Sequence, residues 1–308
     1  MTRKSITVAR KTLGDLSNPK ALAAYFAVYL GVLFFLALII GNNVAPDDAG
    51  ALSVAAQERF MLGAFLTVTH LWAVGLGLLL FGVVAVANTL AREAEEGTLR
   101  IVLSKQVRRW EIVLGTFVGI VLYMLAVGTA NTFVAAAAVY WFADIAPAAL
   151  EGAVFEALPA VVLHALVVSV VVAAVGVSLA VATKSRLQTA VGALAIAAAY
   201  FVLMVVRLLS PARYEDYYFY LADVSYHFGN ALVFGYGATV GDIPAEAQLQ
   251  LSVFSGVYDV QPGEEFETMP ESFELAGHVD PAVSFAALAG GATVLLVVAA
   301  VRFQRIDI

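Results

Sequence analysis

The chain has 308 residues, of which 61% are apolar and only 13% are charged. Soluble domains are usually about half apolar and about a quarter charged, so this composition indicates a membrane protein. The net charge of −7 argues against a nucleic-acid partner, and the lack of cysteine excludes disulfides, thiolate catalysis and cysteine-based metal sites.

The first 20 residues precede any apolar run long enough to cross a bilayer. A helical periodicity within residues 5–17 places four apolar side chains on one face: Ile6, Ala9, Leu13 and Leu16. Lys4, Lys11 and Asp15 lie on the opposite face. This pattern predicts a short basic amphipathic helix at the inner membrane surface. The alternative is a basic segment that only flanks the first span.

Six apolar runs are long enough to cross a hydrocarbon core of about 30 Å. They lie near residues 21–41, 60–90, 112–142, 157–183, 189–209 and 282–302. The first has the length of a span rather than of a signal peptide. The runs are continuous rather than strictly alternating, which favours helices over a membrane β-barrel. The sequence therefore predicts an all-α polytopic membrane protein.

The basic residues indicate the orientation of these spans. Of the 17 Lys and Arg residues, all except Arg59, Arg207 and Arg213 lie before span one, between spans two and three, between spans four and five, or after span six. Cytoplasmic connections carry such an excess of basic residues, so both termini are expected in the cytoplasm of a multi-pass plasma-membrane protein. Most acidic residues lie on the opposite connections.

These predictions describe one membrane domain over residues 1–308. Residues 1–20 form the cytoplasmic amphipathic helix, 21–209 the first five spans, 210–281 an extracytoplasmic loop, and 282–308 the last span and a cytoplasmic tail. A loop of this length is usually functional or disordered, and we expect a small, partly ordered outer cap. Within it, Gln248 to Val253 alternates polar and apolar residues, which predicts a short strand.

The connection between spans two and three reads AREAEEGTLRIVLSKQVRRWE. Gly97 is expected to end a helix and Thr98 to cap the next, a short stretch that begins at Leu99. Three acidic residues precede Gly97 where the orientation predicts bases: Glu93, Glu95 and Glu96. Such charges suit a docking surface for a soluble partner. The alternative is a solvated loop between helices.

Four polar residues fall inside the apolar runs: His70, Asn88, Asn131 and His164. Polar groups inside a membrane are costly and often functional. All except Asn88 fall in the outer halves of their spans, where they could line one polar cavity for a substrate. The alternative is hydrogen bonding between helices, and two histidines could also bind a metal. Gly115 and Gly119 form a G-x-x-x-G pattern that allows close helix packing.

The sequence carries no phosphate-binding loop, no H-E-x-x-H zinc motif and no G-x-S-x-G elbow. If ATP drives this protein, the ATPase is therefore another chain. No Asp or Glu lies within the apolar runs, which argues against a secondary transporter driven by an ion gradient. An intramembrane enzyme would have only His70 and His164 as candidate catalytic groups.

The run EAEEGTLRIVLSKQVRRWEIVLGTFVG resembles the signature of ABC-2 type transporter permeases. The residues that match are Glu96, Gly97, Thr98, Leu99, Leu103, Ser104, Arg109, Glu111, Ile112, Leu114 and Gly115. Lys105 and Thr116 depart from the family, which often has Pro and Lys at these places. The basic opening helix, the six spans and the basic tail also agree with the family's layout.

The resemblance implies the permease subunit of an ABC exporter or flippase, with no catalysis of its own. The connection between spans two and three resembles a coupling helix that docks into the ATPase. The resemblance assigns this role to Glu93, Glu95, Glu96, Gly97, Thr98, Leu99, Arg100, Ile101, Leu103, Arg108 and Arg109. A smaller second contact is expected at the turn between spans four and five, with Lys184 and Arg186.

The family's architecture also implies the partners and cofactors. We expect an ABC ATPase and a second permease copy in the lipid bilayer, with ATP and magnesium on the ATPase and no cofactor on this chain. The large outer loop and the GTLRIVLS run are similar to the permease subgroup partnered with nitrous-oxide reductase maturation. A secondary transporter and a membrane subunit of a copper-site maturation system are the alternatives, and the substrate stays open.

Overall fold

The computed structural model describes residues 2–41, 52–99, 107–260 and 269–305. In these ranges the chain is helical, without a strand, and a single isolated bridge joins Tyr258 to Leu275. The same ranges contain six helices that are long and apolar enough to span a membrane: Pro19–Ile39, Val54–Glu95, Arg109–Phe142, Glu151–Thr183, Arg186–Leu209 and Pro281–Gln304. The prediction of six spans in an all-α membrane protein is therefore confirmed.

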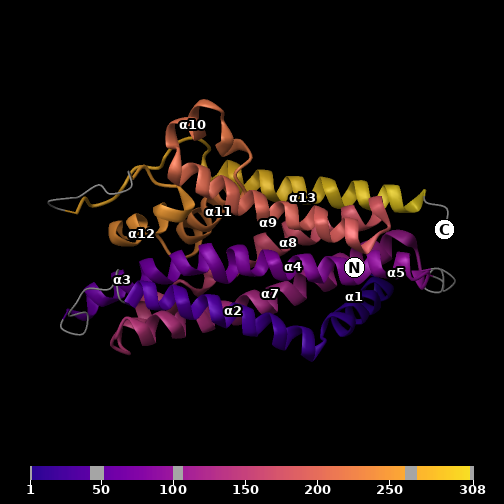
Figure 1. Ribbon diagram of the computed structural model, residues 1–308, viewed down its shortest axis with the longest axis horizontal. Helices are drawn as coiled ribbons and strands as arrows, with labels where there is room; N and C mark the ends of the chain where they lie inside the picture. The colour runs from indigo at the N-terminus through magenta and orange to yellow at the C-terminus, as the bar shows by residue number, and fades with distance from the viewer. Residues whose placement is uncertain (1, 42–51, 100–106, 261–268, 306–308) are drawn as a thin grey trace.

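The long helices run along one axis, and α1 (Arg3–Leu16) lies at the end that holds both termini (Figure 1). The first, third and fifth spans are α2 (Pro19–Ile39), α7 (Arg109–Phe142) and α9 (Arg186–Leu209). The fourth joins the π-helix η5 (Glu151–Phe155) to α8 (Leu158–Thr183), and the sixth is α13 (Pro281–Gln304).

The second span is interrupted twice by π-helical geometry. It consists of α3 (Val54–Val68), η3 (Thr69–Leu76), α4 (Gly77–Val86), η4 (Ala87–Ala91) and α5 (Arg92–Glu95). Gly75 in η3 and Thr89 in η4 have backbone angles outside the helical range. Such single-turn π segments occur frequently at functional sites, so this span carries two places of special interest.

Local signals in the sequence explain where several spans begin and end. The Asn18 side chain accepts hydrogen bonds from the first turn of α2, and Pro19 starts that helix. Asp280 caps α13 in the same way, and Pro281 follows it. Side-chain acceptors at the N-cap satisfy amides that have no partner within the helix. At the other end of α8, Lys184 adopts a left-handed conformation (φ 55°) that stops the helix.

The segment between α9 and α13 is folded into helices. It contains α10 (Pro211–Asp216), the 3-10 turn η6 (Phe219–Leu221), α11 (Val224–Thr239) and α12 (Ala245–Ser255). The strand predicted at 248–253 is wrong, because α12 covers these residues. The buried residues of α12 include Gln248, Leu251, Ser252 and Ser255, at helical spacing. α11 packs against α8 and α13, so part of this cap lies against the spans.

The G-x-x-x-G pattern of α7 receives α1. A methyl group at Gly115 would lie 2.6 Å from Val8 Cβ, and one at Gly119 would lie 2.7 Å from Thr12 Cβ. The predicted helix at the N-terminus is confirmed, but its packed face differs slightly from the predicted apolar face. Its buried residues are Ser5, Ala9, Thr12 and Leu16. The small residues of α7 thus let α1 approach its backbone closely.

Candidate functional site

The predicted coupling residues gather at the end that holds both termini. Arg186 N–H at the start of α9 donates to Glu95 Oε2 (2.7 Å), which joins the turn between α8 and α9 to the end of the second span. Arg109 Nη1 donates to the carbonyls of Phe303 (3.3 Å) and Gln304 (3.1 Å) in α13. Segments far apart in the sequence therefore form one surface here.

The three acidic residues of the predicted docking surface have different environments. Glu93 forms a short ion pair with Lys11 of α1. Glu95 accepts the backbone hydrogen bond at the start of α9. Glu96 is 56% exposed, and its Oε1 lies 3.9 Å from Arg92 Nε. Two of the three charges thus hold this end together, and Glu96 is the acid most available to a partner.

Lys11 has two acidic neighbours, Asp15 in its own helix and Glu93 in the second span. Burial lowers the pKa of Lys11, but hydrogen bonds and charges from Glu93 and Asp15 outweigh this effect and leave the pKa above its ordinary value. Lys11 therefore stays protonated at neutral pH, and α1 is joined electrostatically to the end of the second span.

The rest of the predicted docking segment is only partly described. Gly97 has a left-handed φ of 73° and ends the second span, as expected. Thr98 Oγ1 donates to the carbonyl of Glu93 (3.3 Å), and Leu99 is only 3% exposed because it packs into the core. Three further predicted coupling residues lie outside the described residues: Arg100, Ile101 and Leu103.

The remaining predicted contacts are exposed at this same end. Arg108 is the N-cap residue of α7, and its N–H donates to Glu111 Oε2 (2.8 Å). Thr2 Oγ1 donates to the other oxygen of Glu111 (2.6 Å), which ties the start of α1 to the start of α7. Lys184 and Arg186 flank the turn between α8 and α9 with exposed side chains. Glu111, one of the residues that match the family signature, thus holds the start of α1 against α7.

The structure brings two of the three predicted pathway residues together. His70 of η3 and His164 of α8 are buried, and their ring centroids lie 5.9 Å apart. His70 Nε2 lies 3.3 Å from Ser225 Oγ of α11, and Tyr200 Oη of α9 donates to the carbonyl of His70 (2.6 Å). Four elements therefore meet at this pair of histidines.

Several polar atoms around these histidines are buried without partners. Within the described part of the chain, neither ring nitrogen of His164 has a hydrogen bond, and Nδ1 of His70 also lacks one. The hydroxyls of Thr67 and Thr69 are also buried without a hydrogen-bond partner among the described residues. A buried polar group without a partner costs about 1–3 kcal/mol, so each such group calls for an explanation.

Asn131 belongs to a different network. Its Nδ2 donates to Tyr25 Oη (2.6 Å) and to the carbonyl of Ala73 (2.9 Å), and Tyr29 Oη donates to its backbone carbonyl (2.7 Å). These bonds join α7 to α2 and η3, while Asn131 Oδ1 is buried without a partner among the described residues. Asn88 donates to the carbonyl of Val84 in its own helix (2.8 Å).

Sequence reasoning missed a buried charge cluster at the far end of α9. Arg207 pairs with Asp223 and donates to the carbonyl of Phe254, while Tyr214 Oη donates to Asp223 Oδ2 (2.8 Å). Asp223 also caps α11 through Ser225 N (2.8 Å). Burial and the charge of Asp223 raise the pKa of Tyr214. Arg207 thus ties α9 to the cap.

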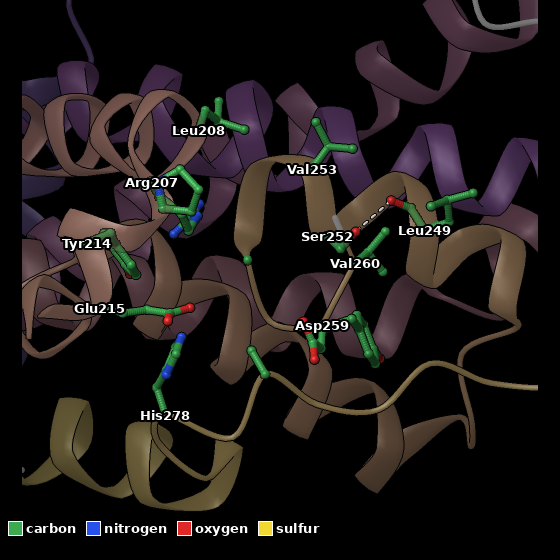
Figure 2. A pocket seen from close by; sticks show the side chains of 14 residues that line it. Arg207, Leu208, Tyr214, Glu215, Leu249, Ser252, Val253, Asp259, Val260 and His278 are labelled. Atoms are coloured by element: carbon green, nitrogen blue, oxygen red, sulfur yellow. Dashed lines mark hydrogen bonds between the residues drawn. The ribbon is translucent and has the colours of Figure 1, made fainter. Parts of the chain in front are cut away.

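A pocket of about 400 Å³ lies beside this cluster (Figure 2). Arg207 and Leu208 of α9 line it together with cap residues such as Tyr214, Asp259 and His278, so it lies between the end of α9 and the cap. The histidine pair lies elsewhere and does not line it. Over the described ranges, no three His, Asp or Glu side chains form a group that could hold a metal ion.

Residues 29–308 match the family model described as ABC-2 family transporter protein. A search of curated proteins found no match. The match begins within α2, so it covers the second part of the first span, the other five spans, and the connection between the second and third.

Proposed function

The chain belongs to the ABC-2 family and is the membrane component, or permease, of an ABC transporter; we propose that it exports or flips its substrate with energy from a separate ATPase. The permease itself is a non-catalytic, multi-pass membrane subunit. Membership of this family implies an ATPase partner. In our proposal that ATPase binds ATP and magnesium, and two permease copies complete the pathway.

We propose that the ATPase docks at the end that holds both termini, which is the cytoplasmic end in the predicted orientation. The observation that carries this proposal is that the end of the second span is bonded both to the turn between α8 and α9 and to α1. Because Glu95 binds the first residue of α9, a displacement of the end of the second span is passed on to α9. Exposed Glu96, Arg108, Lys184 and Arg186 supply charges for the contact.

Reversing the charge of Glu96 tests this docking surface. We expect Glu96→Arg to weaken binding of the cognate ATPase about tenfold, equivalent to about 1.4 kcal/mol. The variant puts a positive charge where the contact has a negative one, so the charges of the two proteins no longer complement each other. Thermal stability of the permease should change little, since Glu96 is exposed. The measurement is binding of the purified ATPase to permease in nanodiscs, with ATP hydrolysis followed in parallel.

Glu156→Arg is the matched control, because Glu156 is an exposed acid after η5, at the other end of the fourth span. This variant should bind the ATPase as the original chain does. If Glu96→Arg also binds normally and couples normally, the proposed docking surface is wrong.

We propose further that the histidine pair becomes part of the substrate pathway when the helices around it separate. The support is the set of buried polar atoms without partners on His70 and His164. A polar residue kept only for stability would be hydrogen-bonded. Groups left unsatisfied in this arrangement gain partners in a state where water or a polar substrate reaches them. The two neighbouring spans, α8 and the second span, would form the walls.

His164→Leu separates a pathway role from a structural one. Leucine removes two unpartnered ring nitrogens, so we expect the free energy of unfolding to rise by about 1–3 kcal/mol. Transport-linked ATP hydrolysis of the assembled complex should fall at the same time. Thermal unfolding in detergent and ATPase assays in nanodiscs measure the two effects.

His227→Leu serves as the comparison, because both ring nitrogens of His227 have partners, Ser284 Oγ at 3.0 Å and the carbonyl of Leu221 at 3.2 Å. It should lose stability rather than gain it. A loss of stability in His164→Leu as well would assign His164 a structural role only.

Within the family, we propose the subgroup partnered with nitrous-oxide reductase maturation as the narrower assignment. The enlarged segment between α9 and α13, folded into α10, α11 and α12, favours it because it offers an outer surface for an extracytoplasmic protein. Genes for an ABC ATPase and a periplasmic copper-maturation protein beside this gene would support the assignment. Their replacement by genes of another pathway would oppose it.

A further inference from the structure

A lateral groove opens between the first two spans near the end that holds both termini. Its volume is about 580 Å³, and its walls come from the end of α1, from α2 and from α4. The exposed walls include Val28, Leu80 and Val84, which face outward from the bundle. The groove therefore opens toward the hydrocarbon of the membrane rather than toward water.

Two arginines stand at one end of this groove. Arg92 contributes a guanidinium whose Nε has no hydrogen-bond partner within the described residues, and its ion pair with Glu96 is long at 3.9 Å. The Arg186 guanidinium has no hydrogen bond or ion pair in the same part of the chain. Asp15 also lines this end, but it is hydrogen-bonded to Lys11 (2.9 Å).

The length of the groove matches one membrane leaflet. Leu80 lies 12 positions before Arg92, a rise of about 18 Å at 1.5 Å per residue. Half of a hydrocarbon core is about 15 Å. The polar end coincides with the start of α2 at Pro19 and the start of α9 at Arg186, where both spans enter the membrane.

The π-helix η4 lies in the same wall. Asn88, which lines the groove, is inside η4, and Arg92 is the first residue after η4. The break at Thr89 (φ −114°, ψ −117°) changes the direction of the chain just before Arg92. A regular α-helix would present Arg92 on a different face. The special backbone geometry therefore belongs to the site that holds the arginine.

We propose that this groove binds one anionic glycerophospholipid. Its phosphate lies between Arg92 and Arg186, and one acyl chain lies along Leu22, Tyr25, Phe81 and Val84. Arginine suits phosphate because its planar donors form paired hydrogen bonds. Basic pockets between membrane helices on the cytoplasmic side bind such headgroups. In the orientation proposed above, the lipid comes from the inner leaflet.

A bound lipid at this position would join three parts of the permease. It would contact the end of α1, the first span and the second span close to the ATPase docking surface. Tyr123 Oη already fixes this end of α1 by donating to the carbonyl of Leu16 (2.8 Å). The lipid would fill the gap that remains between α2 and α4.

Native mass spectrometry of the full-length chain tests the proposal without the ATPase. We expect one phosphatidylglycerol per chain to be retained at least tenfold more tightly than phosphatidylcholine. The Arg92→Gln/Arg186→Gln double variant should lose this preference. The Arg302→Gln/Arg305→Gln double variant should keep it, because these arginines lie on a shallow surface formed by the C-terminal part of α13 and the residue after it.

A steric variant tests the acyl part of the site. Val84→Trp should fill the groove and weaken phosphatidylglycerol binding about tenfold while both arginines remain. Val298→Trp, on the exposed face of α13, should not weaken it. Equal binding of phosphatidylglycerol to the original chain, the arginine variant and Val84→Trp would overturn the proposal.

The other possible occupant is a second copy of the chain. The sequence has no cysteine, so a single Val28→Cys variant reports only on its own position. We expect no disulfide between copies at this site in phosphatidylglycerol nanodiscs. Efficient formation of that disulfide would show that another permease covers the groove, and the lipid proposal would then be wrong. Failure of the docking tests above would leave these binding results unaffected.

Discussion

Replacing Asp223 by asparagine is expected to lower the free energy of unfolding by about 3–5 kcal/mol, because it leaves the Arg207 charge without its partner in a buried site. The carboxylate is fully buried and the arginine side chain is only 11% exposed. Asparagine keeps a side-chain oxygen that can still accept from Ser225 N, so the cap of α11 is preserved. The loss therefore combines the unpaired charge of Arg207 with the hydrogen bond that Tyr214 donates to Asp223 Oδ2. Thermal or denaturant unfolding in detergent measures it.

Two comparison variants make this result specific. Asp216→Asn changes an exposed acid of α10, close to the same cluster in sequence, and should shift stability by less than about 0.5 kcal/mol. Combining Asp223→Asn with Arg207→Gln should recover much of the loss, because no unpaired charge then remains. A loss in Asp223→Asn no larger than in Asp216→Asn would contradict the role assigned to the pair.

Replacing Gly75 by alanine is expected to be the most disruptive single methyl addition in the second span. The added Cβ would lie 1.8 Å from the carbonyl oxygen of His70 and 2.5 Å from Tyr200 Oη. Both distances are too short for atoms that are not bonded to each other. The carbonyl oxygen of His70 belongs to the backbone, so it cannot rotate away as a side chain could. The π-helix η3 must rearrange, and the hydrogen bond from Tyr200 to His70 must break. We expect a loss of about 1–3 kcal/mol or more.

Gly290 and Gly291 of α13 provide the control, since a methyl group at either position meets nothing within 4 Å. Alanine there should stabilise its helix by about 0.5–1 kcal/mol. The comparison uses thermal unfolding in detergent. If Gly75→Ala unfolds at the same temperature as the original chain, the geometry assigned to η3 is wrong.

The sequence was sufficient to predict the six spans because run length and composition are local properties. It did not predict the two π-helices of the second span, since they depend on how that span packs against its neighbours. A similar depth in the spans grouped Asn131 with the histidines, although the Asn131 side chain bonds to Tyr25 and to the carbonyl of Ala73. The strand predicted in the cap was wrong for a related reason. Six alternating residues carry too little information to exclude a helix.

The candidate site shows the same division between local and distant information. The family signature pointed to the loop after the second span, and Gly97 ends the helix as expected. The partners of Glu93 and Glu95 could not be predicted, because Lys11 and Arg186 are 82 and 91 positions away in the chain. Without those partners, all three acids looked like a free docking surface. Only the fold separates Glu96 from the other two.

The packing of α1 against α7 has a consequence for the order in which the protein folds during synthesis. Thr2 is bonded to Glu111, 109 positions later, and Gly115 and Gly119 form the surface on which α1 packs. At about 5–20 residues per second, the part of α7 that packs against α1 is synthesised roughly 5–20 s after α1. During that time the second span, which carries the Glu93 partner of Lys11, is already made, but the surface of α7 is not. α1 is therefore fixed on α7 only after the third span is made, and until then its contacts are with the earlier spans and the membrane surface.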